Sequence, residues 1–323
     1  MLTNKKRIRF ALIGSGTIAK YHAEVIIKLN HIISVVLIHS KKQKNIDFCT
    51  TFNVATILTS LKELKNNTSN YDAIIICTPW YSNEQTLETI LKFNLNKPIL
   101  IEKPMVLSHT KLQNLQQKYN LSNILIGCNR RHYDFIPQLK NIISTSTIIS
   151  VDVLSAEPFN SIDKSHNLAD NMLCFYSIHI IDLLFELFGP LTLSSCQKII
   201  VEEKKHYILT LFSHKNSCYI QIKILLDVAQ NSYIKMYCSD KTIELLPIEQ
   251  MRIYTKMEKR ITDKNAVYTP KVDETYTTSS QFKPGFENQL KFFINRYIMN
   301  QYTSCQEFTR LNLIMALFDE INK

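Results

Sequence analysis

The chain has 323 residues, of which 45% are hydrophobic and 20% are charged, and its formal net charge at pH 7 is +10. This composition excludes disordered and collagen-like chains, and the length suits two domains. The longest apolar stretches, such as residues 74–77 and 178–184, are far shorter than the roughly 18 residues that a membrane span needs. The sequence therefore predicts a soluble protein with no membrane partner.

The positive charge is spread along the chain. Only residues 5–9, 41–44 and 256–260 form short basic groups, so a nucleic-acid partner is not expected. The 8 cysteines include no Cys-x-x-Cys pair and lie mostly in apolar runs, which is typical of small core residues in the reducing cytoplasm. The histidines outside the motifs discussed below show no metal-ligand spacing, so no metal site is expected.

Glycine is rare: the chain has 5 glycines among its 323 residues, whereas glycine makes up about 7% of an average protein. Two of them lie in Gly14-Ser15-Gly16, between an apolar run over residues 7–13 that predicts a strand and an amphipathic pattern over residues 18–29 that predicts a helix. This order matches the dinucleotide-binding fingerprint G-x-G-x-x-G/A. In that pattern Gly14 makes the turn, Gly16 lets the backbone approach a pyrophosphate, and Ala19 lets the helix pack closely on the strand.

The start of this helix is where an anion would bind, because its backbone N–H groups lack partners and the helix dipole is positive there. The alternative is a plain turn between strand and helix without a ligand. We expect the following residues to bind the pyrophosphate of a cofactor: Gly14, Ser15, Gly16, Thr17 and Ile18.

The first 125 residues alternate between strands and helices. Continuous apolar runs predict strands over residues 31–38, 73–78 and 98–102, and helical patterns cover residues 58–64 and 84–93. Strands that are apolar on both sides are typical of a parallel sheet covered by helices on both faces. The sequence therefore predicts an α/β fold in which residues 1–125 form a doubly wound, dinucleotide-binding Rossmann domain.

The ribose of the cofactor is expected beside residues 39–42. A Rossmann domain that binds NAD usually has Asp or Glu about 20 residues after the glycines, to bind the ribose 2′-hydroxyl. Here the sequence is His39-Ser40-Lys41-Lys42, with no acid. A hydroxyl followed by lysines suits a 2′-phosphate, so Ser40 and Lys41 are predicted to bind NADP, which is favoured over NAD. The alternative is a solvated loop.

Two further motifs follow predicted strands. Thr78-Pro79 ends one strand, and Glu102-Lys103-Pro104 ends the next. Open α/β sheets bind their ligands at the carboxyl ends of the strands. A lysine held beside a cationic nicotinamide would also have its pKa lowered towards the range of proton transfer. We therefore expect Thr78, Pro79, Glu102 and Lys103 to contact the cofactor.

Residues 126–323 have the pattern of a second domain, of α+β type. Alternating patterns predict strands over residues 148–154, 193–201, 207–213, 218–226, 232–238 and 242–246, several of them joined by short polar turns. Helices are predicted over residues 171–188 and near the C-terminus. Most of the strands are expected to pair antiparallel. The polar residues 258–281, rich in Thr and Ser, are expected to form a mobile loop near the site.

The glycine fingerprint, the Thr-Pro turn and Glu102-Lys103-Pro104 together resemble the glucose-fructose oxidoreductase, inositol dehydrogenase and rhizopine catabolism (Gfo/Idh/MocA) family. The resemblance continues through residues 127–131, 177–184 and 286–297, so it covers nearly the whole chain. It implies an NAD(P)-dependent dehydrogenase or reductase whose substrate is a sugar, a cyclitol or a nucleotide-linked sugar. It also implies a homodimer or homotetramer that assembles through the outer face of the second domain's sheet.

The resemblance also implies roles for individual residues. Lys103 would orient the reacting oxygen and share its proton, and His179 would be the general acid/base, for which imidazole is suited because its ordinary pKa lies near neutrality. Arg131 is a further expected substrate contact, as are Tyr176 and Asp182, each three residues from His179 in the predicted helix. Structural alternatives are a core position for His179 or Tyr176 and a carboxylate partner for Arg131.

Two positions depart from the family pattern. Phe175 replaces an acid that the family often has, and Asn83 stands where its Thr-Pro turn often leads to a histidine. These departures keep a second hypothesis open, a cofactor-binding sensor without activity, and a third is a reductase of an imine or a linear tetrapyrrole. A role in making a surface polysaccharide precursor is a further hypothesis, since a basic protein suits an anionic nucleotide-sugar. The sequence leaves the substrate, the direction of the reaction and the number of subunits open.

Overall fold

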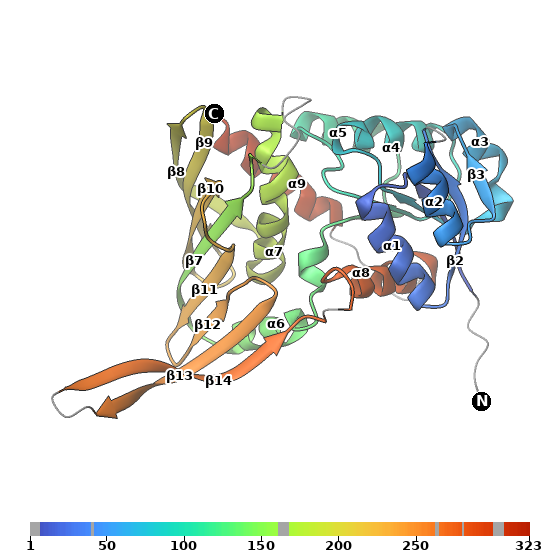
Figure 1. Cartoon of the computed structure of the whole chain (residues 1–323). Helices are drawn as coiled ribbons and strands as arrows, with labels where there is room; N and C mark the ends of the chain where they lie inside the picture. The colour runs from blue at the N-terminus through green and yellow to red at the C-terminus, as the bar shows by residue number, and fades with distance from the viewer. Residues whose placement is uncertain (1–6, 40–41, 161–167, 262–264, 280, 300–306) are drawn as a thin grey trace. The chain divides into compact units, whose positions relative to one another are not determined.

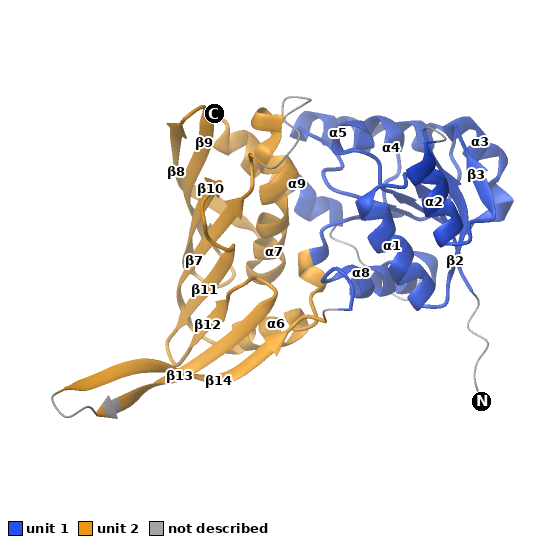
Figure 2. Ribbon diagram, viewed as in Figure 1, with its two compact units in different colours: residues 1–129, 280–312 blue, residues 130–279, 313–323 orange. Residues whose placement is uncertain are grey.

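The structure is a computed structural model that describes residues 7–39, 42–160, 168–261, 265–279, 281–299 and 307–323. The chain divides into two compact units (Figure 2): residues 1–129 and 280–312 form the first, and residues 130–279 and 313–323 form the second. The first change of unit, after residue 129, lies close to the expected boundary at residue 125. Residues 280–312, by contrast, return to the first unit.

A six-stranded sheet is the centre of the first unit. Its strands are β1 (Arg9–Ile13), β2 (Ile32–Leu37), β3 (Thr56–Leu58), β4 (Ala73–Ile76), β5 (Ile99–Ile101) and β6 (Ile124–Ile126). All are parallel, and their order is β3-β2-β1-β4-β5-β6. Every residue of β4 and β5 is buried, as expected of strands covered on both faces. This order confirms the predicted doubly wound Rossmann fold.

Helices connect these strands (Figure 1): α1 (Thr17–Lys28), α2 (Gln43–Thr51), α3 (Leu61–Asn66), α4 (Asn83–Lys92) and α5 (His109–Lys118). The helix predicted over residues 58–64 begins later, because Leu58 still belongs to β3. The hydroxyl of Ser60 accepts the backbone N–H of Glu63 (3.3 Å), and the carboxylate of Glu63 accepts the backbone N–H of Thr59 (3.0 Å). This reciprocal bonding resembles a capping box and sets the start of α3. Within the described residues, no helix has both the length and the apolar character needed to cross a membrane.

A helix from late in the chain, α8 (Phe286–Phe293), completes the core of the first unit. Phe286, Leu290 and Phe293 are buried in the same apolar cluster as Ala19 and Ile26 of α1. The helical path then continues to residue 298 as a wider, π-helical turn. A sequence pattern shows that such a helix has an apolar face, but not which core that face will cover. The division into consecutive domains at residue 125 therefore misses the return of this segment.

An eight-stranded sheet is the centre of the second unit. Its strands are β7 (Ile148–Glu157), β8 (Leu191–Val201), β9 (Lys204–Ser213), β10 (Cys218–Leu226), β11 (Tyr233–Cys238), β12 (Thr242–Leu245), β13 (Gln250–Ile261) and β14 (Ala266–Thr277). Their order is β14-β13-β12-β11-β7-β10-β9-β8. Neighbours pair antiparallel, except that β7 and β10 are parallel. The predicted α+β domain with a largely antiparallel sheet is confirmed.

The two faces of this sheet differ in exposure. α6 (Ile136–Thr145) and α7 (Ile178–Phe188) lie along one face (Figure 1), where Val151, Leu209 and Ile220 are fully buried. On the opposite face Tyr219 and Tyr237 are 55% and 39% exposed. The chain ends in α9 (Glu307–Ile321).

The expectation of a mobile loop over residues 258–281 is wrong. Most of this segment belongs to the long antiparallel hairpin of β13 and β14, in which Tyr254 pairs with Val272 and Lys259 pairs with Tyr268. The Thr-rich sequence also contains Val and Tyr, and β-branched and aromatic residues favour strands. Polarity alone is therefore a poor guide here, because β14 and the part of β13 after residue 254 are largely exposed where the structure describes them and can be polar on both sides.

Candidate functional site

Four strand ends of the first unit lie level with one another. The register pairs Ile13 of β1 with Ile76 of β4, Ile76 with Ile101 of β5, and Ile101 with Ile126 of β6. The residues that follow these four are therefore neighbours at the carboxyl edge of the sheet: Gly14, Cys77, Glu102 and Gly127. The strand order reverses between β1 and β4, and this is the place where open α/β sheets bind ligands.

Gly14 makes the turn that the fingerprint predicts. Its φ of +111° is a conformation that L side chains rarely adopt, and a Cβ here would lie 2.6 Å from the carbonyl oxygen of Cys77. Its backbone N–H donates to the carbonyl of Leu37 (2.9 Å). The chain therefore passes tightly over the ends of β2 and β4 before α1 begins.

Gly16 stands at the N-cap of α1 with open space around its missing side chain. A Cβ added here would meet no atom within 4 Å, so no neighbouring protein atom requires a glycine. Among the described residues no side chain caps α1, and its first turn contains no acid. Ala19 is fully buried, as the close packing of helix on strand requires. This arrangement fits a pyrophosphate on the backbone N–H groups that begin α1.

The predicted ribose contacts Ser40 and Lys41 lie outside the described residues. The chain beyond them is placed: Lys42 is exposed and precedes α2. The hydroxyl of Ser15 donates to the side-chain oxygen of Asn45 in α2 (2.9 Å). The first turn of α2 therefore lies beside the glycine turn.

Thr78 and Lys103 reach the same edge as the glycine turn. Thr78 is 7% exposed, and its hydroxyl donates to the side-chain oxygen of Asn83 in α4 (2.7 Å). Pro79 follows it. Lys103 is half-buried and comes directly after Glu102, with a cis peptide bond between Lys103 and the following proline. The first unit thus brings the predicted cofactor contacts of β4 and β5 to the switch point.

Glu102 is held inside the unit by a histidine of α1. The Nε2 atom of His22 lies 2.8 Å from Oε1 of Glu102, and the two residues are 1% and 7% exposed. A Cβ at Gly127 would lie 3.1 Å from the same carboxylate oxygen, so this second aligned glycine makes room for the Glu102 side chain. Burial, and then the charge of Glu102, hold the pKa of the Cys77 thiol well above its usual value. Glu102 therefore anchors the end of β5 to α1.

In the second unit, Arg131 and Asp182 form a buried ion pair. The guanidinium and carboxylate are 3.4 Å apart, and the residues are 7% and 4% exposed. Burial, and then the charge of Arg131, lower the pKa of His132 well below its usual value. Asp182 follows His179 by three residues in α7, hence on about the same helix face. The carboxylate partner considered for Arg131 is therefore Asp182, another predicted site residue.

Tyr176 lies in a π-helical turn over Leu173–Ser177 that leads into α7. Burial, followed by the charges of Glu157 and Asp227, raises the pKa of its phenol to about 12. The sequence predicts one regular helix over residues 171–188, whereas the structure widens its beginning. Such turns are frequent at functional sites. His179 follows in the first turn of α7 and is half-buried.

In the second unit, Glu157 and Asp227 line a pocket of about 510 Å³. Glu157, at the end of β7, is 5% exposed and bonds to Ser155. Asp227 follows β10 and lies 3.0 Å from the ammonium of Lys204. The pocket offers carboxylates and amides, which suit hydroxyl groups of a ligand. Its polar lining includes Arg130, Glu157, Asp227, Gln230, Asn231 and Glu249.

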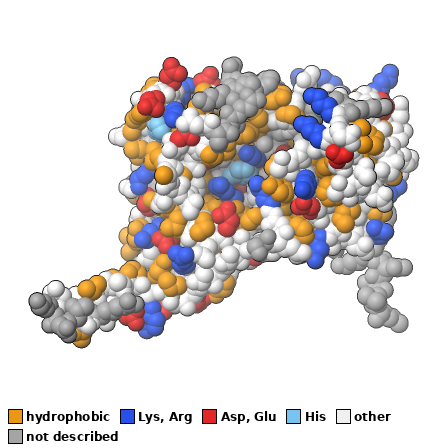
Figure 3. Space-filling model, in the orientation of Figure 1, with side chains coloured by type: hydrophobic (Ala, Val, Ile, Leu, Met, Phe, Trp, Pro, Cys, Tyr) orange, Lys and Arg blue, Asp and Glu red, His pale blue; other side chains and the backbone are white. Residues whose placement is uncertain are grey.

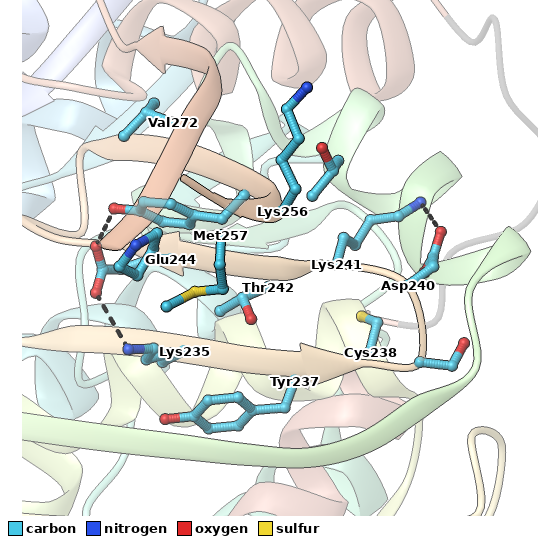
Figure 4. A pocket seen from close by; sticks show the side chains of 14 residues that line it. Lys235, Tyr237, Cys238, Asp240, Lys241, Thr242, Glu244, Lys256, Met257 and Val272 are labelled. Carbon is cyan, nitrogen blue, oxygen red and sulfur yellow. Dashed lines mark hydrogen bonds and ion pairs between the residues drawn. The ribbon is translucent and has the colours of Figure 1, made fainter. Parts of the chain in front are cut away.

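A larger pocket of about 920 Å³ lies over β11 to β14 (Figure 4). Most of its charged groups pair with one another: Glu244 accepts the hydroxyl of Tyr254 (2.9 Å) and lies 3.9 Å from Lys235. Lys241 and Asp240 are likewise 2.9 Å apart. Of the described residues that line it, none is a predicted site residue. The described residues that line the smaller pocket include no predicted site residue either, but its acids Glu157 and Asp227 raise the pKa of Tyr176. We therefore take the strand ends of the first unit and, separately, the smaller pocket of the second unit as candidate sites.

Basic side chains are scattered over the face of the molecule in Figure 3, among acidic and apolar ones. On this face they form no single patch. The absence of a nucleic-acid partner stays a prediction.

Each unit thus assembles a part of the predicted site. Lys103 belongs to the first unit and His179 to the second, and their joint action stays a prediction. Sequence reasoning missed the partner of Glu102 and the two acids near Tyr176. The amphipathic pattern does place His22 on the apolar face of its helix, but no local signal points to Glu157.

The first unit matches a known protein family. Residues 8–128 match a family described as an oxidoreductase family with an NAD-binding Rossmann fold. Oxidoreductase P35 of Formosa agariphila is 27% identical over 156 residues, which are 47% of this chain and 47% of that protein. The chain therefore matches about half the length of this relative.

Solved structures share the fold over nearly the whole chain. A dehydrogenase of Clostridium difficile has a TM-score of 0.74 and 18% identity, over 98% of this chain and 99% of its own. Levoglucosan dehydrogenase, in complex with NADH and L-sorbose, has a TM-score of 0.76 and 11% identity, over 98% of this chain and 96% of its own. At these identities the likeness shows the fold alone.

Proposed function

We propose that this chain, which belongs to the Gfo/Idh/MocA oxidoreductase family, transfers a hydride between NADP or NAD and a neutral polyhydroxylated substrate, a sugar or a cyclitol. One observation carries the proposal. The glycine turn and the ends of β4 and β5, with Thr78 and Lys103, lie level at the switch point of a parallel sheet. A dinucleotide bound there would have its reactive end beside a lysine.

The residues of the first unit suit such a cofactor, which when bound would supply or accept the hydride. The backbone N–H groups of Thr17 and Ile18 would hold the pyrophosphate, with Gly16 leaving room for its approach. The exposed Lys42, next to Ser40 and Lys41, supports NADP ahead of NAD, because a lysine attracts a 2′-phosphate.

Lys103 and His179 would carry the proton chemistry. The ammonium of Lys103 would orient the reacting oxygen by a charge-assisted hydrogen bond. His179 would take the proton of the hydroxyl in oxidation and return it in reduction. Asp182, held by Arg131, lies on about the same face of α7 as His179 and would help to position it.

The smaller pocket supports a neutral substrate. Its lining has three carboxylates, those of Glu157, Asp227 and Glu249, against the guanidinium of Arg130. Even with the ammonium of Lys204, which pairs with Asp227, negative charge remains in excess. Hydroxyl groups would donate to these carboxylates, whereas the diphosphate of a nucleotide-linked sugar would be repelled. We therefore place a sugar or a cyclitol ahead of a nucleotide-linked sugar, and ahead of the polysaccharide-precursor hypothesis that depends on one.

We also propose a homodimer or homotetramer that forms through the exposed face of the eight-stranded sheet. Phe212 pairs with Tyr219, and Tyr219 and Tyr237 each pair with Ser150. These four residues of β9, β10, β7 and β11, here named the aromatic row, therefore lie side by side on one face. Exposed aromatic clusters are typical of protein interfaces. The proposed location is the cytoplasm, where the scattered cysteines would stay reduced.

Nucleotide titration tests the cofactor site. The chain has 1 tryptophan, Trp80, directly after Pro79, so its fluorescence reports on this edge of the sheet. NADPH and NADH should both quench it saturably, with NADPH binding more tightly. Gly16→Asp should abolish the quenching, because its carboxylate would occupy and repel the pyrophosphate position. Asn114→Asp, which adds the same charge on the exposed side of α5, should bind like the wild type.

A substrate screen then tests the reaction. Sugars, cyclitols and nucleotide-linked sugars are offered with each nucleotide, and the absorbance of the reduced cofactor is followed. Turnover of a neutral compound that is lost in Lys103→Ala and in His179→Ala is the expected result. Binding without turnover of any of them would favour the sensor hypothesis. Failure to bind either nucleotide would overturn the proposed function.

A further inference from the structure

Asn83 uses its whole side-chain amide to join two strand ends. It is the first residue of α4 and is fully buried. Its Oδ1 accepts the hydroxyl of Thr78 (2.7 Å), and its Nδ2 donates to the carbonyl of Glu102 (3.0 Å) and to that of Pro104 (3.1 Å). Carbonyl oxygens only accept, so these partners fix which end of the amide is which. Both N–H groups of this side-chain amide therefore bind backbone carbonyls, and these carbonyls belong to the two neighbours of a single residue.

That residue is Lys103. The ladder of the parallel sheet holds the chain as far as the N–H of Glu102, which donates to the carbonyl of Ile76 (2.9 Å). Beyond this point β5 has ended, and Pro104 has no N–H to donate. The carbonyls of the two residues that flank Lys103 are instead bound by the side chain of Asn83. Thr78, at the end of β4, fixes that side chain in turn. The backbone of Lys103 is thus clamped between its neighbours.

We propose that Asn83 is a positioning residue for Lys103. By binding the carbonyls of Glu102 and Pro104, it sets the direction in which the lysine leaves the strand end. Thr78 takes part by orienting the amide. The consequence for turnover rests on the proposed function, but the clamp itself does not depend on it.

The clamp predicts a local loss of order when the amide is removed. In Asn83→Ala the two carbonyls lose this partner, and buried carbonyls without partners favour local opening. The amide hydrogens of residues 102–107 should then exchange about tenfold faster, because each lost hydrogen bond shifts the opening equilibrium. Thr78→Val leaves both carbonyl bonds in place and removes only the bond that orients the amide, so it should raise the exchange by less.

A matched control separates this effect from a general loss of stability. Tyr71 is fully buried in the first unit, and its hydroxyl donates to the carbonyl of Leu64 (3.0 Å). Tyr71→Phe therefore removes one buried hydrogen bond to the backbone at a place remote from Lys103 in the chain. It should leave the exchange of residues 102–107 and the turnover unchanged.

Two measurements on the full chain test the proposed role of Asn83. In hydrogen exchange with mass spectrometry, faster exchange of residues 102–107 in Asn83→Ala and Thr78→Val, but not in Tyr71→Phe, supports the clamp. Equal exchange in all four proteins overturns it. If Asn83→Ala does not fold, Thr78→Val decides on its own, since unchanged exchange there would contradict the role of Thr78 in the clamp.

Turnover gives the second test. With a substrate found by the screen, Asn83→Ala should lower kcat by about tenfold, while the Kd for NADPH stays within about twofold of the wild type. An unchanged kcat would overturn the positioning role. A wild type that turns over no substrate but shows the exchange difference would contradict the proposed function and leave the clamp supported.

Discussion

The buried contact between His22 and Glu102 ties the strand end that carries Lys103 to the helix of the glycine turn. In His22→Ala the carboxylate loses this partner inside the unit, and the ring of Phe286, 4.7 Å away between centroids, loses its neighbour. We expect a destabilisation of about 3 kcal/mol, because removing one member of a buried polar pair leaves the other uncompensated. The fluorescence of Trp80 during heating measures it, since this tryptophan lies in the first unit.

Glu102→Gln is the matched variant for this pair. Glutamine has nearly the same volume and can still bond to the imidazole, so its melting temperature should fall by less than half as much. Equal losses in the two variants would show that the carboxylate charge, and not the contact with His22, supports the strand end.

Tyr176 stays protonated over the pH range in which an imidazole titrates. Burial first, and then the charges of Glu157 and Asp227, raise the pKa of its phenol to about 12. Since an unfolded tyrosine ionises near pH ~10, the stability that this group contributes is present below that pH and is lost as the pH rises through about 12. The pH profile of turnover should therefore show no limb from Tyr176 below pH ~10.

The carboxylate that contributes to this shift can be removed. Glu157→Gln deletes one charge but keeps the burial, so the pKa of Tyr176 should fall only part of the way to its ordinary value. Titration of ¹³Cζ-labelled tyrosine by NMR measures this, with the signal assigned by its loss in Tyr176→Phe. A pKa that does not move in Glu157→Gln would refute the influence of this acid on Tyr176.

Among the elements, α8 is the one whose place decides the boundary of the first unit. Phe286 is 3% exposed, and its ring contacts those of Tyr21 and His22, 5.9 and 4.7 Å away between centroids. Phe286→Ala should therefore cost about 4 kcal/mol, as large cavities in cores do. Phe292 of the same helix is 36% exposed, so Phe292→Ala should cost less than about 1 kcal/mol. Similar melting curves for the two variants, followed by Trp80 fluorescence, would argue against α8 as part of this core.

What the sequence predicts well is local. The apolar runs that become β1, β4 and β5, and the glycine turn before α1, are visible within short stretches, because a buried strand and a tight turn restrict neighbouring residues. The contacts that complete the site are not local: His22 is 80 residues from Glu102, and Arg131 is 51 residues from Asp182. The hairpin of β13 and β14 was likewise not predicted. Met251, Ile253 and Met257 of β13 do alternate with polar residues, but most of the hairpin is polar and exposed, which is also typical of a loop.

For the whole molecule, the aromatic row predicts assembly. Tyr219 and Tyr237 are 55% and 39% exposed in the middle of a sheet whose other face is covered by helices, and burying such aromatic side chains would stabilise an interface. Light scattering after gel filtration should show a dimer or a tetramer. The double variant Tyr219→Lys, Tyr237→Lys should raise the dissociation constant of this oligomer by about 100-fold or more, since each lysine would place a charge in the interface.

A control variant and a nucleotide-binding measurement distinguish a loss of assembly from a loss of folding. Tyr81→Lys changes a tyrosine of the first unit that is 45% exposed, and it should leave the mass unchanged. The residues predicted to hold the pyrophosphate also lie in the first unit, so a double variant that has only dissociated should still quench Trp80 with NADPH. A wild type that is monomeric, or a double variant that keeps its mass, would contradict assembly through the aromatic row.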